Sequence, residues 1–185
     1  MTSVQLSKPR RTTSSPADFD PGFNPTVPLD PIELRNTLGH FATGVNVLTY
    51  ESQGTNYGMT INSFTSVSLD PALVLVSIDR SSKALPYLME NFFAINVMSE
   101  DQLDVALQFA GKPQEDLVID WVFHGLAPRI GQTAAYFQCR PWETYDGGDH
   151  VLIVAQVDEL GQNDDAQPLL FHRGKWGALA ASDRK

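Results

Sequence analysis

Short apolar runs separated by turn residues recur along most of this chain. Continuous or alternating apolar residues over four to ten positions predict strands, because side chains alternate between the two faces of a sheet. The predicted strands cover residues 44–51, 57–65, 73–78, 92–97, 134–144, 151–160, 169–172 and 176–179. This many short strands with few helices favours a mostly antiparallel β-barrel.

Helical spacing is confined to a few short segments. Asp30 followed by Pro31 is typical of an N-cap and the first residue of a helix. Ser82 is predicted to cap a short helix over residues 84–90, and residues 101–109 carry apolar side chains at helical spacing. The helices are therefore expected to be minor parts of the fold.

The chain length fits one domain with a substantial core. It has 185 residues, of which 42% are hydrophobic. Residues 1–28 are rich in Ser, Thr and Pro and poor in large apolar residues, which predicts a flexible N-terminal tail. The folded domain is expected to cover residues 29–180.

The formal net charge of −9 narrows the set of partners. An acidic surface repels nucleic acid phosphates and anionic lipid, so neither nucleic acid nor a membrane is expected as a partner. An anionic ligand would draw on few cations in the folded part. There are eight of these cations, and two pairs of them form clusters, Arg80 with Lys83 and Arg173 with Lys175.

A single cysteine, Cys139, excludes an intrachain disulfide and agrees with a reducing compartment. Its place in a long predicted strand indicates a small core residue rather than a nucleophile. No apolar segment resembles a secretory signal or a membrane span. The expected location is cytoplasmic.

Several common catalytic motifs are absent from the sequence. There is no G-x-G-x-x-G, no G-x-x-x-x-G-K-[ST] and no G-x-S-x-G. The four histidines show no metal-ligand spacing, so no metal site is expected. The chemistry therefore has to come from another kind of site.

Hydroxyl and amide side chains crowd residues 58–71, which are read as a strand and its exit turn. Residues 77–83 add further hydroxyls beside two cations. Such a surface suits a ligand with many hydrogen-bonding edges and a phosphate, and a flavin nucleotide is such a ligand. The residues in question are Thr60, Asn62, Ser63, Thr65, Ser66, Ser77, Arg80, Ser81, Ser82 and Lys83.

These segments, with their order and spacing, resemble the flavin reductase-like family. The matching motifs are F-A-T-G-V at 41–45, T-x-N-S-F-T-S-V-S-L-D-P at 60–71, S-x-D-R-S-S at 77–82, G-D-H at 148–150 and P-L-L-F at 168–171. The resemblance runs from about residue 34 to 179. Members include the reductase components of two-component flavin-dependent monooxygenases.

The resemblance implies a split antiparallel β-barrel of the FMN-binding type with a few short helices. Such proteins are usually homodimers that bind flavin near the subunit interface. They oxidise NADH or NADPH and reduce FAD or FMN, and the reduced flavin reaches a partner monooxygenase. We accordingly expect an NAD(P)H:flavin oxidoreductase, with NADH favoured over NADPH.

The resemblance also implies roles for the polar residues. Thr60, Asn62 and Ser63 are expected at the flavin ring edge and ribityl chain. The flavin phosphate is expected among the other polar residues of the two segments, with Arg80 as a planar fork. The residues on that second list are Thr65, Ser66, Ser81, Ser82 and Lys83, and Ser77 is a further candidate for cofactor binding.

The nicotinamide side of the site is expected around the G-D-H motif. His150 is the implied catalytic residue, acting by position rather than by proton transfer, and Asp149 orients its ring or caps the turn. Trp176 either covers the nicotinamide or only packs in the core. Arg173 is a candidate for the NADH pyrophosphate.

Two other functions remain open on the residues alone. One is a flavin-binding protein without reductase activity, which would have no need of His150 in this context. The other is an FMN-dependent oxidase of the pyridoxamine phosphate type on the same barrel, which would need a larger basic cluster. The sequence does not choose between FAD and FMN.

Overall fold

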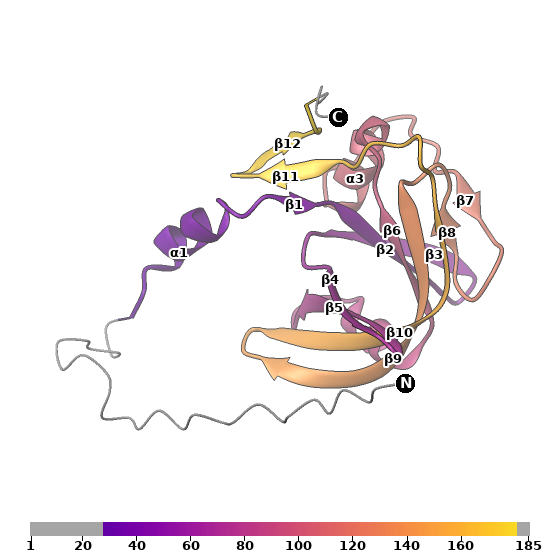
Figure 1. Cartoon of the computed structure of the whole chain (residues 1–185), viewed down its shortest axis with the longest axis horizontal. Coiled ribbons are helices and arrows are strands. Elements are labelled where there is room, and N and C mark those ends of the chain that lie inside the picture. Colours follow the sequence, from indigo (N-terminus) through magenta and orange to yellow (C-terminus); the bar gives the residue numbers. More distant parts are fainter. Residues whose placement is uncertain (1–27, 181–185) are drawn as a thin grey trace, which may run out of the picture.

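The computed structural model describes residues 28–180, so the expected flexible tail of residues 1–28 lies, except for Pro28, outside the described residues. Figure 1 shows the chain. Its helices are α1 (Pro31–Leu38), α2 (Leu85–Glu90) and α3 (Leu103–Phe109), with a 3₁₀ turn at Glu100–Gln102. Its strands are β1 (Thr43–Gly44), β2 (Asn46–Ser52), β3 (Thr55–Ile61), β4 (Thr65–Leu69), β5 (Ala72–Asp79), β6 (Phe93–Val97), β7 (Trp121–Val122), β8 (Arg129–Ile130), β9 (Ala135–Gly147), β10 (His150–Gln162), β11 (Leu170–His172) and β12 (Lys175–Gly177).

Seven strands form one curved sheet in the order β3-β2-β6-β9-β10-β5-β4. A second sheet has the order β1-β11-β12, and β7 pairs with β8. The strand pairs in the described part are antiparallel, which confirms the mostly β, antiparallel prediction. The barrel does not close, because β3 and β4 are the two edges of the large sheet and do not pair (Figure 1).

The sequence predicts one strand over residues 57–65, and this extent was wrong, because the strand ends at Ile61. The chain leaves β3 after Ile61 and begins β4 at Thr65, at the opposite edge of the sheet. Between them, the Ser63 hydroxyl donates to the Ser77 carbonyl at 2.9 Å and accepts from the Ser77 N–H at 3.1 Å. Ser63 thus replaces ladder hydrogen bonds and carries the chain across to β5.

The core has two clusters, one on each side of the strand β2. Leu48, Phe93 and Ile95 belong to the first and are fully buried. Val47 belongs to the second, which packs α3 against the sheet. Cys139 lies in the first cluster, where burial raises the pKa of its thiol to about 12. This confirms the prediction of a core cysteine, because a thiolate would not form at neutral pH.

The helix α1 begins as the sequence predicts. Asp30 is its N-cap, and the Ile32 N–H donates to the Asp30 carboxylate at 2.8 Å. The helix has no buried residue and extends away from the sheets (Figure 1). The predicted cap of the helix α2 was wrong, because α2 begins at Leu85 with Ala84 as its N-cap and no side-chain cap bond. The Ser82 hydroxyl instead accepts from the Ala84 N–H at 3.2 Å, in the turn before the helix. No helix within residues 28–180 has the length and apolar character to cross a membrane.

A buried amide in β9 holds the loop that follows β7. Gln138 is fully buried, and its side-chain oxygen accepts from the Leu126 N–H and, at 2.8 Å, from the Ala127 N–H. Its amide nitrogen donates to the His124 carbonyl at 2.8 Å. Gly125 has φ 101°, and a Cβ there would overlap the Gln138 amide, so glycine is required between these contacts.

Candidate functional site

Three of the predicted site residues, Thr60, Asn62 and Trp176, line one pocket of about 210 Å³. Thr60 lies near the end of β3, Asn62 follows that strand, and Trp176 comes from β12. Elements far apart in sequence therefore meet at this point. The full lining is Val45, Thr60, Ile61, Asn62, Ala110, Phe171 and Trp176.

The wall of this pocket is mostly apolar, with polar groups confined to the end of β3. Phe171 and Trp176 pack edge to face with ring centroids 5.1 Å apart, which fixes the β11–β12 hairpin over the pocket. The Thr60 hydroxyl donates to the Ala106 carbonyl of α3 at 2.6 Å and keeps lone pairs free to accept. Such a wall suits a flat ring with one polar edge.

Asn62 and Ser63 connect the pocket to β5, which leads to the polar residues Asp79 and His150. Asn62 lines the pocket, and its neighbour Ser63 is hydrogen-bonded to the backbone of Ser77 in β5. Ser77 is two residues before Asp79, and Asp79 lies opposite His150 in the β5–β10 ladder. Ser63 therefore links the segment that lines the pocket to the part of β5 that pairs with His150.

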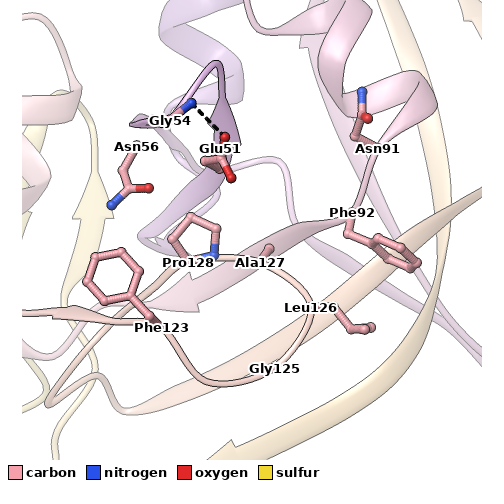
Figure 2. A pocket seen from close by; sticks show the side chains of 10 residues that line it. All are labelled: Glu51, Gly54, Asn56, Asn91, Phe92, Phe123, Gly125, Leu126, Ala127 and Pro128. Carbon is pink, nitrogen blue, oxygen red and sulfur yellow. Dashed lines mark hydrogen bonds between the residues drawn. The ribbon is translucent and has the colours of Figure 1, made fainter.

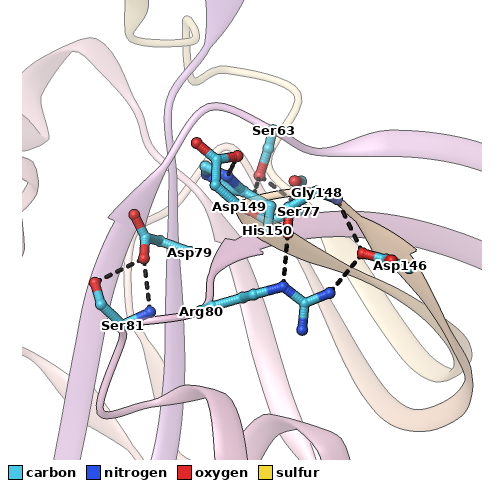
Figure 3. Close-up of polar contacts among 9 residues, drawn as sticks. All are labelled: Ser63, Ser77, Asp79, Arg80, Ser81, Asp146, Gly148, Asp149 and His150. Atoms are coloured by element: carbon cyan, nitrogen blue, oxygen red, sulfur yellow. Dashed lines mark hydrogen bonds and ion pairs between the residues drawn. The ribbon is translucent and has the colours of Figure 1, made fainter.

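Arg80 directly follows β5, and its side chain reaches the turn between β9 and β10, as Figure 3 shows. Its Nε donates to the Gly148 carbonyl at 2.7 Å and its Nη2 donates to the Asp146 carboxylate at 2.6 Å. Its own N–H donates to the Asp149 carbonyl at 3.0 Å. The guanidinium of Arg80 therefore lies on the hairpin that carries His150, and its contact with a flavin phosphate stays a prediction.

The carboxylates around this turn are held in the ionised form. The Gly148 N–H lowers the pKa of Asp146, and Arg80 adds to the effect. Hydrogen bonds from the Ser81 side chain and N–H likewise lower the pKa of Asp79. Because both pKa values are depressed, these contacts are present at neutral pH and are lost only when the pH falls through the lowered values.

His150 opens β10 with its ring held by its neighbour. Its Nδ1 lies 2.7 Å from the Asp149 carboxylate, and its side chain is 39% exposed (Figure 3). The carboxylate orients the ring and favours the proton on Nδ1, so Nε2 remains available to a ligand. This is the orienting role expected of Asp149.

The turn between β5 and α2 carries the predicted phosphate residues. The Ser81 N–H and hydroxyl donate to the Asp79 carboxylate at 2.7 and 2.6 Å. The Ser82 hydroxyl accepts from the Ala84 N–H and lies 3.9 Å from the Met59 sulfur in β3. Lys83 is exposed, and no ion pair joins it to another residue in the part the structure describes.

The remaining predicted residues lie at the margins. Thr65 and Ser66 are exposed on the edge strand β4. Arg173 is exposed in the β11–β12 turn at φ 50° and lies outside the pocket lining. Within residues 28–180, no group of three or more His, Cys, Asp or Glu side chains could hold a metal ion.

The apolar part of the pocket was not predicted from the sequence. Ile61 and Ala110 line it, yet their own signal in the sequence is only an apolar side chain, which a core residue shares. Phe171 also lines it and is the last residue of the P-L-L-F motif. Val45 also lines it and is the last residue of the F-A-T-G-V motif. The two motifs were therefore the available signal, since Val45 and Phe171 end them and both residues line the pocket.

A larger pocket lies elsewhere and contains none of the predicted residues. It measures about 530 Å³ and is formed at the tip of the β2–β3 hairpin, the end of α2 and the loop held by Gln138 (Figure 2). We assign the site to the smaller pocket because three predicted residues, Thr60, Asn62 and Trp176, line it and none lines the large one. The large pocket is lined by Glu51, Gly54, Asn56, Asn91, Phe92, Phe123, Gly125, Leu126, Ala127 and Pro128.

Residues 38–180 match the family described as flavin reductase like domain. The chain is 35% identical to an NADH-dependent flavin reductase of Rhodococcus sp over 90% of this chain and 93% of that protein. It is 37% identical to the reductase component of a 4-nitrophenol 4-monooxygenase/4-nitrocatechol 2-monooxygenase of Rhodococcus opacus, over 81% and 82% of the two chains. It also superimposes, with TM-score 0.76 and 32% identity, on the NADH:FAD oxidoreductase SgcE6 of Streptomyces globisporus in complex with NAD and FAD fragments. That alignment covers 84% of this chain and 96% of the other.

Proposed function

Since this chain belongs to the flavin reductase like domain family, we propose that it is an NADH-dependent flavin reductase that supplies reduced flavin to a partner monooxygenase. The observation that carries the proposal is the pocket where Thr60, Asn62 and Trp176 converge within the matched domain. The flavin is FAD or FMN. The relatives named for NADH favour NADH over NADPH.

The residues present fit a flavin. The apolar pocket wall suits its ring, and Thr60 and Asn62 offer hydrogen bonds to a polar ring edge. When bound, the flavin supplies the hydride acceptor for NADH, and the chemistry belongs to the two cofactors. The chain therefore needs no nucleophile, which agrees with the buried thiol of Cys139.

The chain's own residues bind and orient the two ligands. Asn62 and Ser63 are proposed at the flavin ring and ribityl chain. Ser81, Ser82 and Lys83 are proposed at the phosphate, where exposed Lys83 supplies a cation. Thr65, Ser66 and Ser77 are proposed as further contacts along β4 and β5, and Trp176 and Arg173 on the nicotinamide side.

Arg80 is proposed to act through the hairpin turn rather than by direct contact with phosphate. Its bonds to Asp146 and Gly148 use its Nε and one of its Nη groups. Together with its N–H bond to Asp149, they hold the segment that precedes His150. A direct phosphate contact would have to come from the other Nη group.

We propose that the protein is a homodimer whose partner completes the pocket. A pocket of about 210 Å³ is small beside the roughly 300–1,000 Å³ that is usual for ligand sites. The helix α1 and its flanks expose Leu29, Ile32, Leu38 and Phe41 at 64–76%, a large apolar surface for a protein in water. A second copy would cover this surface and add a wall to the flavin site.

The location is proposed to be cytoplasmic, where NADH and the partner oxygenase are found together. The partner oxygenase is proposed to receive reduced flavin by diffusion. Rapid loss of reduced flavin to oxygen would make a nearby oxygenase advantageous, but the oxygenase need not form a stable complex.

The test is NADH oxidation by the purified protein with FAD, FMN or no flavin added. We expect turnover that requires added flavin, and the loss of NADH absorbance measures it. Tight flavin binding without turnover would favour a flavin-binding protein. Oxidation of pyridoxamine phosphate without NADH consumption would favour the FMN-dependent oxidase.

Ser82→Glu is expected to weaken FMN and FAD binding at least roughly tenfold. The new carboxylate would place like charge at the proposed phosphate position, and such repulsion costs on the order of 1–4 kcal/mol near a surface. Fluorescence titration of each flavin measures the effect. Thr55→Glu, an exposed change at the β2–β3 tip, is the matched control and should leave both affinities unchanged. Unchanged affinity in Ser82→Glu would remove Ser82 from the site.

A further inference from the structure

Three tyrosines from three elements stack beside the proposed phosphate turn. Tyr50 in β2 stacks with Tyr57 in β3, with ring centroids 5.4 Å apart and planes 17° apart. Tyr50 also stacks with Tyr87 in α2, at 5.5 Å and 19°. Tyr50 is buried at 6% exposure, whereas Tyr57 is 45% exposed and Tyr87 is 37% exposed. A buried ring thus supports two rings that face solvent.

The exposed rings lie close to the turn of Ser81, Ser82 and Lys83. The Ser82 hydroxyl lies 3.9 Å from the Met59 sulfur, and Met59 is two residues after Tyr57 on the same face of β3. Two residues along a strand span roughly 6–7 Å. On the other side, Ser82 leads directly into α2, where the Leu85 N–H donates to the Ser82 carbonyl at 3.2 Å.

The hydroxyls of the exposed tyrosines make no hydrogen bond within the described part of the chain. Within residues 28–180, no hydrogen bond joins the Tyr57 or Tyr87 hydroxyl to another residue. The rings are therefore not held out by a polar network, and their exposure leaves apolar area uncovered. A flat aromatic group of a ligand would cover that area.

We propose that Tyr57 and Tyr87 form a platform for the adenine of FAD, and that the protein therefore prefers FAD to FMN. This rests on the proposed function, because it takes the flavin phosphate to lie at Ser81–Lys83. FAD continues from that phosphate through a second phosphate and a ribose to adenine, whereas FMN ends there. Lys83 is exposed in the same turn and offers a cation to the second phosphate.

The stacking of a base on an aromatic side chain explains the size of the preference. Such stacking contributes roughly 1–3 kcal/mol per base, which corresponds to about fivefold to 150-fold in affinity. The buried Tyr50 keeps the platform rigid, so little side-chain entropy is lost on binding. FMN gains nothing from the platform.

The large pocket is the competing place for adenine. Phe123 is 74% exposed on its rim, and Asn56, the neighbour of Tyr57, lines it from the other face of β3. None of Ser81, Ser82 and Lys83 lines that pocket. The tyrosines are favoured because they adjoin the phosphate turn through Met59.

The experiment compares dissociation constants for FAD and FMN, and NADH turnover with each, in the full-length protein. Tyr57→Leu should weaken FAD at least about fivefold while FMN affinity stays within about twofold. Tyr57→Phe keeps the ring and should bind FAD like the unchanged protein. Tyr87→Leu should weaken FAD in the same direction. Phe123→Leu is the control and should change neither flavin.

Three results would overturn the platform. They are an equal loss of FAD and FMN in Tyr57→Leu, an unchanged FAD affinity in that variant, and an FAD-specific loss in Phe123→Leu. The last would move adenine to the large pocket. Failure of the proposed function looks different, because the unchanged protein would then oxidise NADH with neither flavin. If the protein reduced FMN and FAD equally well and Tyr57→Leu were unaffected, the adenine platform would be refuted and the reductase function would stand.

Discussion

Replacement of His150 by alanine is expected to lower NADH-dependent turnover about 100-fold at saturating flavin. His150 stands at the start of β10 with Nδ1 bound to Asp149 at 2.7 Å, so Nε2 is aimed by a fixed ring. We propose that it positions the nicotinamide rather than moves a proton, since hydride transfer needs no acid at that point. A displacement of about 1 Å between reacting groups costs on the order of 10²-fold in rate.

The measurement is steady-state NADH oxidation together with flavin titration. Flavin affinity should change little, because the pocket lined by Thr60 and Asn62 is formed without His150. Asp149→Asn should show a smaller fall in turnover, since it weakens only the orienting bond. His124→Ala, an exposed histidine on the loop after β7, is the matched control. Collapse of flavin binding with unchanged turnover per bound flavin would contradict the assignment.

Gln138→Leu is expected to lower the free energy of unfolding by about 3 kcal/mol. The fully buried amide binds the Leu126 and Ala127 N–H groups and the His124 carbonyl. A leucine of similar size would leave these groups without a partner, and each unsatisfied buried group costs about 1–3 kcal/mol. Opening of the loop to water would limit the total.

Denaturant titration of both proteins gives the difference directly. Gln162→Leu is the control, because its amide makes one exposed bond to Asp164 and should change stability by less than about 0.5 kcal/mol. Flavin reduction by Gln138→Leu at a permissive temperature should stay near that of the unchanged protein, because the loop lines the large pocket instead. A loss of stability no greater than that of the control would show that the loop is held by other contacts.

Local signals in the sequence were sufficient where the structure depends on neighbouring residues. Asp30 caps α1 as its spacing before Pro31 predicts, because a cap acts over one helical turn. The long apolar runs around Cys139 and Val151 gave the two long strands β9 and β10, because a buried strand reads as a continuous apolar pattern. Their hairpin turn is shorter than expected, with only Gly148 and Asp149 between the strands.

Contacts between distant segments were not predictable in the same way. The hydroxyl row was read as one strand, yet Ser63 bonds to Ser77 and the chain crosses to the opposite edge of the sheet. The guanidinium of Arg80 donates to Asp146 and Gly148, more than sixty residues away, and residue types alone did not predict these partners. A pattern of residue types shows what a side chain offers but not which partner will be nearest.

The sequence by itself determined the mostly β class, the core role of Cys139 and, through the motifs from Phe41 to Phe171, the family. These follow from periodicity and from residue types in a fixed order, which are properties of the chain alone. Only the tertiary structure decided that Thr60, Asn62 and Trp176 share a pocket, that Arg80 holds the turn before His150, and that Tyr57 and Tyr87 both stack on Tyr50. The physical reason is that such contacts depend on sheet order and register, which bring together residues that the sequence separates.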